Sequence, residues 1–150
     1  MTALLFEAAR QRYALDVSSI IEVIPAVRLR TLTGVPACVA GVLRYRGAVV
    51  PVIDVNQVLT GQPARPSFST RLVIVRYSAV SGTERPLGLL LERASRGVAS
   101  NVGELVSTGI ATTDAPYLGP LAAAGAESVQ FVNPGELVPP DVRDRLFAES

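Results

Sequence analysis

Few side chains in this sequence could carry out covalent or acid–base chemistry. The 150 residues include no histidine, lysine or tryptophan, one cysteine, and 14 arginines as the only basic residues. Serine–histidine and cysteine–histidine catalysis need an imidazole, and a P-loop or a Schiff base needs a lysine. Cys38 stands alone, which excludes a histidine–cysteine zinc site and an intrachain disulfide. Only carboxylates remain for catalysis or for binding a metal.

The carboxylates are not arranged as a catalytic or metal-binding set. Asp54 ends an apolar run, as the phosphorylated aspartate of a receiver domain does, but a receiver also needs a lysine and alternating strands and helices. We interpret Asp54 as the cap of a short following helix. Asp141 and Asp144 fall in a predicted terminal helix, and no dense pair of acids suits glycoside hydrolysis or a hard metal ion. We therefore expect no enzymatic activity, no metal and no cofactor.

The run Arg44-Tyr45-Arg46-Gly47 is the most unusual local feature of the sequence. An arginine before a glycine turn can bind a carboxylate through two parallel hydrogen bonds. The same four residues could instead form a solvated hairpin corner. The sequence alone leaves both interpretations open.

Glu22 is the one charge in the apolar run of residues 20–24, so it must face water or meet a cation. The spacing from Ser19 to Glu22 also fits a helix capping box. Against that alternative, the run is β-branched and Pro25 stops it after barely one helical turn. A pairing of Glu22 with Arg46 would satisfy both charged groups.

The elements that would position these residues are mostly strands, because apolar residues recur with a period of two. Residues 4–8 and 13–17 predict a hairpin that turns around Arg10-Gln11. Further strands are predicted at residues 48–55, 71–77, 86–92, 97–102, 105–111 and 128–132, whereas residues 20–27 are rich in β-branched residues but broken by Pro25. Short helical turns are predicted at residues 36–41 and 55–59 and from Pro139 onward. Pro51 predicts an edge or bulged strand, and residues 122–126 a flexible loop or poor helix.

Many short strands between turns predict an all-β barrel or sandwich, and two small interlocked barrels would fit one chain of this length. No internal repeat is obvious in the sequence. The chain is 49% hydrophobic but 5% aromatic, so the core must be aliphatic, and Cys38 is expected to be buried in it.

A net charge of +1 gives no sign of nucleic-acid binding. Residues 31–43, the longest uncharged stretch, are too short to span a membrane, and with no secretory signal we expect a cytoplasmic protein.

In the order and spacing of its motifs, the chain resembles the CheW family of chemotaxis coupling proteins. The matching blocks are Leu5-Phe6, Tyr13-Ala14-Leu15, Ile20-Ile21-Glu22-Val23-Ile24, Gly41-Val42-Leu43-Arg44-Tyr45-Arg46-Gly47, Val50-Pro51-Val52-Ile53-Asp54, Arg71-Leu72-Val73-Ile74-Val75 and Gly88-Leu89-Leu90-Leu91. Any one block would be a weak signal, but together they are specific.

The resemblance implies two SH3-like five-stranded β-barrels that share a hydrophobic interface, with a short C-terminal helix. Residues 1–150 would form a single CheW-like domain made of these two interlocked subdomains. The family is non-enzymatic, binds no cofactor, and couples the cytoplasmic tip of methyl-accepting chemoreceptors to a CheA-type histidine kinase. Its receptor-binding surface, around the groove between the barrels, would map onto Ile20, Glu22, Gly41 and Arg46. The kinase contacts cannot be placed on individual residues.

The chain departs from the family pattern in two regions. Arg44-Tyr45 stands where the family usually has Asn-Leu before Arg-Gly. The half of the chain after Glu92 matches the family pattern only loosely. Its blocks at residues 114–120 and 137–147 are most similar to the CheW-like subunits of Wsp-type surface-sensing pathways, which leaves open whether the output is flagellar chemotaxis or a diguanylate cyclase. The alternative from a different class is a small-ligand-binding β-barrel, which would need a cavity with polar groups pointing inward.

Overall fold

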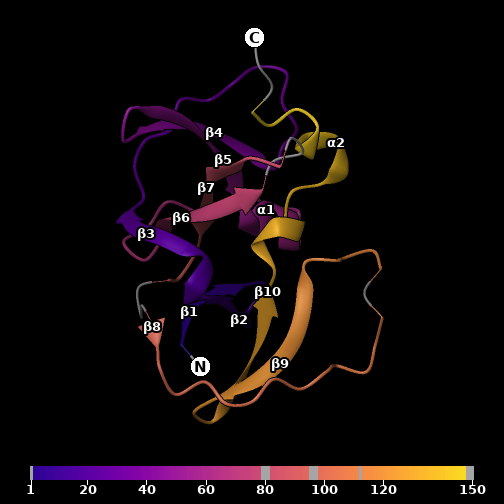
Figure 1. Cartoon of the computed structure of the whole chain (residues 1–150). Helices are drawn as coiled ribbons and strands as arrows, with labels where there is room; N and C mark the ends of the chain where they lie inside the picture. The colour runs from indigo at the N-terminus through magenta and orange to yellow at the C-terminus, as the bar shows by residue number, and fades with distance from the viewer. Residues whose placement is uncertain (1, 79–81, 95–97, 112, 148–150) are drawn as a thin grey trace.

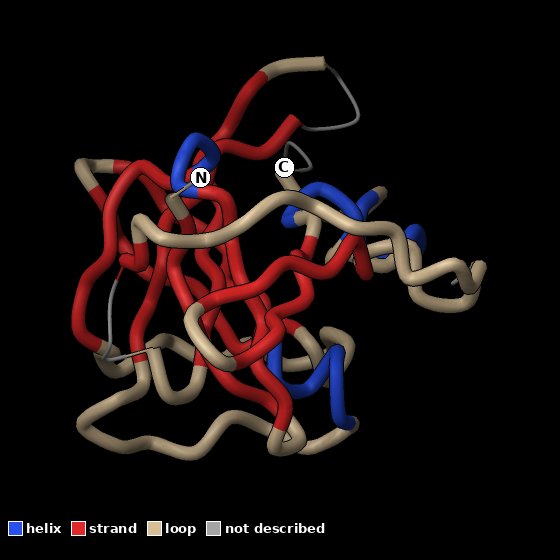
Figure 2. The backbone as a smooth tube through the Cα atoms, turned by 90° about the horizontal axis from the view of Figure 1, so that it is seen from below, coloured by secondary structure: helices blue, strands red, loops and turns tan. Residues whose placement is uncertain are grey.

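The computed structural model describes residues 2–78, 82–94, 98–111 and 113–147. Strands and isolated bridges take up 47% of the described residues and helices 12%, which confirms the predicted mostly β fold, and Figure 2 shows how short the helical segments are. The strands are β1 (Ala3–Ala8), β2 (Gln11–Asp16), β3 (Ile20–Pro25), β4 (Val39–Tyr45), β5 (Ala48–Asp54), β6 (Arg71–Ser78), β7 (Glu84–Leu91), β8 (Val98–Ala99), β9 (Leu118–Ala124) and β10 (Glu127–Val132). The helices are α1 (Val55–Thr60) and α2 (Pro140–Arg143), with single 3-10 turns η1 (Val17–Ser19) and η2 (Pro134–Glu136). No described helix is long and apolar enough to cross a membrane.

The strands form two five-stranded sheets, each curled into a small barrel, as predicted (Figure 1). Barrel A, in the lower half of Figure 1, has the strand order β8-β1-β2-β10-β9, and barrel B, in the upper half, has the order β3-β6-β7-β5-β4. Each sheet closes where the chain beyond one edge strand meets the other edge strand. Arg30, beyond β3, pairs with Val42 of β4, and Val102, beyond β8, pairs with Ala124 of β9.

The two barrels are built alike, although the sequence shows no obvious repeat. β4 ends at Tyr45 and β9 at Ala124, and each strand is followed by a two-residue turn and then by its hairpin partner. Asp54 and Asn133 then cap the helical turn that follows each hairpin. Equivalent residues in the two hairpins therefore differ by 79 in number, as 45 and 124 or 54 and 133 do.

Each half of the chain begins with a hairpin, and this hairpin lies in the barrel that contains the remaining strands of the other half. The β1–β2 hairpin belongs to barrel A although β3, β4 and β5, which follow it, form barrel B. The β6–β7 hairpin belongs to barrel B although β8, β9 and β10 belong to barrel A. Each barrel thus contains strands from both halves, so neither half can complete a barrel by itself.

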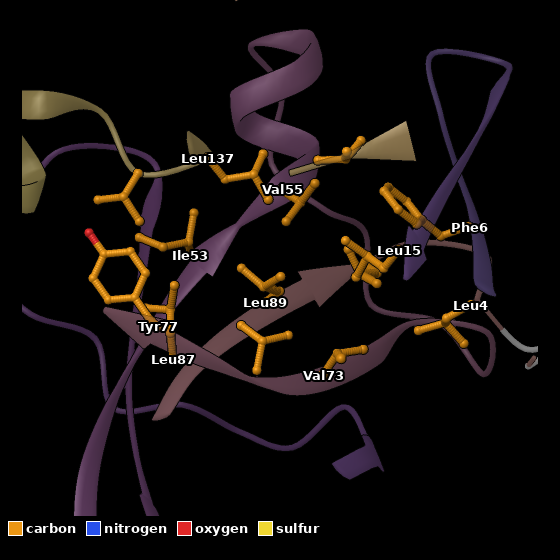
Figure 3. Close-up of a cluster of buried hydrophobic side chains, with 14 of the residues drawn as sticks. Leu4, Phe6, Leu15, Ile53, Val55, Val73, Tyr77, Leu87, Leu89 and Leu137 are labelled. Carbon is orange, nitrogen blue, oxygen red and sulfur yellow. The ribbon is translucent and has the colours of Figure 1, made fainter. Parts of the chain in front are cut away.

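Because side chains alternate along a strand, β1 and β6 each contribute to two hydrophobic cores. Ala3 and Leu5 point into barrel A, whereas Leu4 and Phe6 point into a larger cluster between the barrels. We call this the shared cluster; its buried members are Leu4, Phe6, Leu15, Cys38, Ile53, Val55, Val73, Val75, Tyr77, Leu87, Leu89, Leu91, Ala94, Val132, Leu137, Val138 and Val142. Figure 3 shows side chains from β1 and β2 facing those from β5, β6 and β7. Each fully buried aliphatic side chain contributes about 1.5–3 kcal/mol.

Several predicted elements are correct in kind and location. The β1–β2 hairpin is present, although its turn lies at Ala9-Arg10, one residue before the predicted position. Asp54 caps α1 as predicted, with its carboxylate accepting from the backbone N–H of Gln57 at 3.1 Å. The C-terminal helix begins at Pro140, although α2 has only four residues.

Three other predictions about elements are wrong, and a fourth is not fully covered by the described residues. Residues 105–111 form no strand, because Val106 makes only an isolated bridge to Leu121. Residues 122–124 end β9 rather than forming a loop or helix. The turn predicted at residues 36–41 ends earlier, because β4 begins at Val39. The predicted turn tip at residues 81–82 lies partly outside the described residues.

The edge-strand alternative for Pro51 is wrong, because β5 is an inner strand between β7 and β4. The β4–β5 pair is bulged as the other alternative expected, but the bulge lies on β4, between Val39 and Gly41. Pro51 pairs with Val42 of β4, and the register of β5 with β7 begins only at Val52. A proline is therefore tolerated in this inner strand just before its second ladder starts.

We propose that residues 1–150 unfold as a single domain, because the shared cluster belongs to both barrels. Leu89→Ala should destabilise the protein by about 2–5 kcal/mol, since Leu89 is fully buried in that cluster. Hydrogen exchange should show an equal loss of protection in β2 of barrel A and in β6 of barrel B. A loss confined to β6 would show that the barrels unfold separately.

Cys38 lies in the shared cluster with 9% of its surface exposed, so its predicted burial is confirmed. Burial raises the pKa of the Cys38 thiol, which lowers the thiolate fraction at neutral pH. A thiol reagent should therefore label native protein slowly and denatured protein at once. Stoichiometric labelling of the native protein within the mixing time would contradict this prediction.

Candidate functional site

Closing barrel B brings the chain that follows β3 against the other edge strand, β4, and we call this junction the β3–β4 seam. At one end of the seam, Arg30 and Val42 exchange two backbone hydrogen bonds of 3.0 and 2.9 Å. At the other end, side chains cross it from Glu22 on β3 to Tyr45 and Arg46 on β4 and its turn. We call these three residues the seam cluster.

The Glu22 carboxylate holds the seam cluster together by accepting two hydrogen bonds on one oxygen, Oε1. The Tyr45 hydroxyl donates to it at 2.5 Å and Arg46 Nη2 donates to it at 3.1 Å. The Arg46 guanidinium also lies over the Tyr45 ring, 5.0 Å from its centroid. The predicted pairing of Glu22 with Arg46 is therefore present, and the capping-box alternative for Glu22 is wrong, because Glu22 lies in a strand.

The seam cluster is open to solvent on its charged side. The side chains of Arg46 and Glu22 are 69% and 40% exposed, so their ion pair contributes only about 0–1 kcal/mol to folding. The pKa of Tyr45 is raised, first by its hydrogen bond to the Glu22 carboxylate and then by burial. The phenol therefore remains a hydrogen-bond donor at neutral pH.

The local backbone explains how these residues reach the seam. Arg46 and Gly47 form the β4–β5 turn with φ angles of 51° and 80°, as a two-residue hairpin turn of type I′ requires. Both edge strands also contain a register shift, between Ile20 and Glu22 in β3 and between Val39 and Gly41 in β4. Such bulges turn the following side chains to a new direction.

Gly41 occupies a position that no other residue could fill without a backbone shift. Its φ is +148°, and a Cβ atom built there would lie 2.4 Å from the Arg30 carbonyl oxygen. Gly41 is also buried, so it presents no side chain to a partner. Its direct role is to let Arg30 approach β4 and close the barrel.

Ile20 is half-buried and packs against the shared cluster rather than joining the seam cluster. Of the four residues predicted for the site, the structure thus brings only Glu22 and Arg46 into contact. Tyr45, which contacts both of them, was not among the predicted site residues. Its position between two arginines was visible in the sequence, but nothing there indicated which residue its hydroxyl would reach.

No group of three or more cysteine, aspartate and glutamate residues in the described part of the chain could hold a metal ion. A polar groove of about 1130 Å³ lies around the β1–β2 turn and α1. Glu7, Arg12 and Glu127 form a network of ion pairs there, with Arg12 Nε 2.7 Å from Glu127 Oε2. Its arginines and glutamates are interspersed, so the groove carries no concentrated charge for an ionic ligand.

A model of the CheW-like domain family matches residues 2–139 of this chain. The chain belongs to the CheW-like domain family. In the structural comparison it is similar to the scaffolding protein TtCheW from Thermoanaerobacter tengcongensis, with a TM-score of 0.75 and 20% sequence identity over 92% of this chain and 87% of that one. No match was found among curated protein sequences.

Family membership confirms the predicted resemblance and, with the structural match, the two-barrel CheW fold. The matched model describes CheW-like domains in general, so the Wsp-type assignment remains a prediction. The seam cluster lies in residues 22–46, well inside the matched region.

Gly41→Ala should destabilise this CheW-like protein by about 3 kcal/mol or more, because the new Cβ would collide with a backbone oxygen at the closed seam. Gly34→Ala is the matched control. Gly34 also has a positive φ, +79°, but has nothing within 4 Å of its would-be Cβ, so alanine there should cost only about 1–2 kcal/mol. Chemical denaturation measures both. Equal losses would show that the close approach of Arg30 does not constrain Gly41.

Proposed function

We propose that this CheW-like protein is a non-enzymatic adaptor that couples methyl-accepting chemoreceptors to a CheA-type histidine kinase in bacterial chemosensory signalling. It would act in the cytoplasm beside membrane-bound receptor arrays. Its membership of the CheW-like family supports this function, and the similar protein TtCheW is itself named a scaffolding protein.

The seam cluster is the observation that carries the proposal, because a barrel of this kind can close without charged side chains. In barrel A the positions equivalent to Tyr45 and Arg46 are Ala124 and Gly125. Barrel A nevertheless closes with backbone hydrogen bonds, including one of 2.8 Å from Gly103 N to Ala123 O. Among the described residues, charged side chains are paired across only one of the two equivalent seams, which supports a binding role for that pair.

The proposed receptor-binding surface consists of Ile20, Glu22, Gly41 and Arg46, with distinct contributions. Glu22 and Arg46 would set the register of a receptor helix through their charges, because charged pairs give orientation and specificity more than affinity. Ile20 supplies partly buried apolar area nearby on β3. Gly41 would act indirectly, by allowing the seam to close.

The barrel interiors argue against the alternative of a small-ligand-binding protein. Val52, Leu72 and Ile74 fill barrel B and are fully buried. Barrel A is filled by aliphatic side chains and Phe131. A ligand barrel would need polar groups pointing into a cavity.

The direct test mixes the purified protein with a soluble cytoplasmic hairpin of a chemoreceptor and with a CheA-type kinase, both encoded in the same genome. An adaptor should bind each one and should form a ternary complex with both. Binding to neither partner would overturn the proposal.

Arg46→Glu should weaken binding of the receptor hairpin by about 2–5 kcal/mol, roughly 30-fold or more, if a receptor carboxylate meets Arg46. Arg44→Glu is the matched control: Arg44 is exposed on β4, two residues before Arg46, and has no ion pair among the described residues. It makes the same charge change and should leave most of the affinity intact. Calorimetric titration measures both, and equal affinities of wild type and Arg46→Glu would exclude Arg46 from the receptor-binding surface.

A further inference from the structure

Tyr45 has one end in the core of barrel B and the other at the charged surface. Its ring packs against the cluster of Val52, Leu72 and Ile74 inside the barrel. Its hydroxyl reaches the Glu22 carboxylate at 2.5 Å on the opposite side of the seam. A tyrosine suits such a position because it has an apolar body and a polar tip.

We infer that Tyr45 is the positioning residue of the receptor-binding surface, holding the Glu22 carboxylate with its hydroxyl and the Arg46 guanidinium with its ring. The inference rests on the proposed receptor-binding function of Glu22 and Arg46. Tyr45 itself need not touch the receptor, because it acts through its two neighbours.

The hydrogen bonds that Glu22 accepts leave part of the Glu22–Arg46 ion pair available to a partner. Both donors, the Tyr45 hydroxyl and Arg46 Nη2, meet the same oxygen, Oε1. Glu22 Oε2 has no hydrogen bond within the described residues, and only Nη2 of the Arg46 guanidinium is engaged. A receptor could therefore donate to Oε2 and accept from Arg46 without breaking the contacts that orient them.

Tyr45 would increase affinity by ordering two long side chains before the receptor arrives. Glutamate and arginine lose considerable rotamer freedom when they are fixed at an interface. Here the ring under the guanidinium, 5.0 Å away, and the hydrogen bond to the carboxylate impose much of that order in the free protein.

The hydroxyl of Tyr45 is not needed to fill the barrel. A leucine at this position could fill the barrel but could not donate to Glu22. Barrel A has Ala124 at the equivalent place, so the architecture does not demand a tyrosine. The hydroxyl is therefore best explained by the charged pair that it contacts.

Tyr45→Phe tests the inference because it removes only the hydroxyl. It should weaken binding of the receptor hairpin about 3- to 10-fold, as expected for one lost hydrogen bond. Tyr77→Phe is the matched control, since Tyr77 lies in the same barrel and its buried hydroxyl has no hydrogen-bond partner among the described residues. The control should bind the receptor hairpin like wild type.

A double-mutant cycle separates positioning from a structural role. In a Glu22→Ala background, Tyr45→Phe should have no further effect on affinity, because the hydroxyl has lost its acceptor. A loss that persists in that background would overturn the inference and show that the hydroxyl acts through the fold. Arg46→Glu gives the third comparison. If it weakens binding and Tyr45→Phe does not, the positioning role fails and the receptor-binding proposal stands; if neither weakens binding, both fail.

Discussion

The structure depends on the burial of both faces of its central strands. β1 and β6 each contribute alternate side chains to a barrel interior and to the shared cluster, so residues 3–6 of β1 and 72–75 of β6 are buried on both faces. Two barrels of this size would have small separate cores. The exchange of hairpins solves this problem, because each half of the chain then provides one wall of the shared cluster. The position of every other element follows from how the two barrels wrap around that cluster.

One consequence is that each barrel must close at the edge away from the shared strands. Barrel A closes with backbone contacts between small or aliphatic residues, such as Val106 and Leu121. Barrel B closes with a backbone bridge at Arg30 and with side chains at the seam cluster. Closure removes edges that could pair with other chains. It also places charged residues from two distant segments, Glu22 and Arg46, side by side on an ordered surface.

Patterns with a local cause were predictable from the sequence. The alternating faces of apolar side chains in residues 71–77 predicted β6. In the structure, one face is buried in the interior of barrel B and the other in the shared cluster. The pairing of Glu22 with Arg46 followed from two charges that each lacked a partner. Asp54 was recognised as a helix cap because a short helix and Gly61 follow it.

Features that depend on tertiary context were not predictable in this way. The alanines at the end of β9 have low strand propensity, and they form a strand because β10 pairs with them. Val106 has strand-like neighbours, but only one residue of its segment meets β9, so no strand forms there. The repeat between the hairpins is conserved in length and register rather than in residue type. For the same reason the partner of Tyr45 could not be inferred, because barrel closure alone brings Glu22 to it.

The composition of the chain suits such a seam. All its basic residues are arginines, and the guanidinium of Arg46 donates to Glu22 while it lies over the Tyr45 ring. A lysine ammonium could form the ion pair but has no planar group to stack on an aromatic ring. The guanidinium has five N–H donors, so donors remain for a partner after both internal contacts are made. The proposed adaptor role would use this combination, because the charges are ordered before binding and donors remain available to a partner.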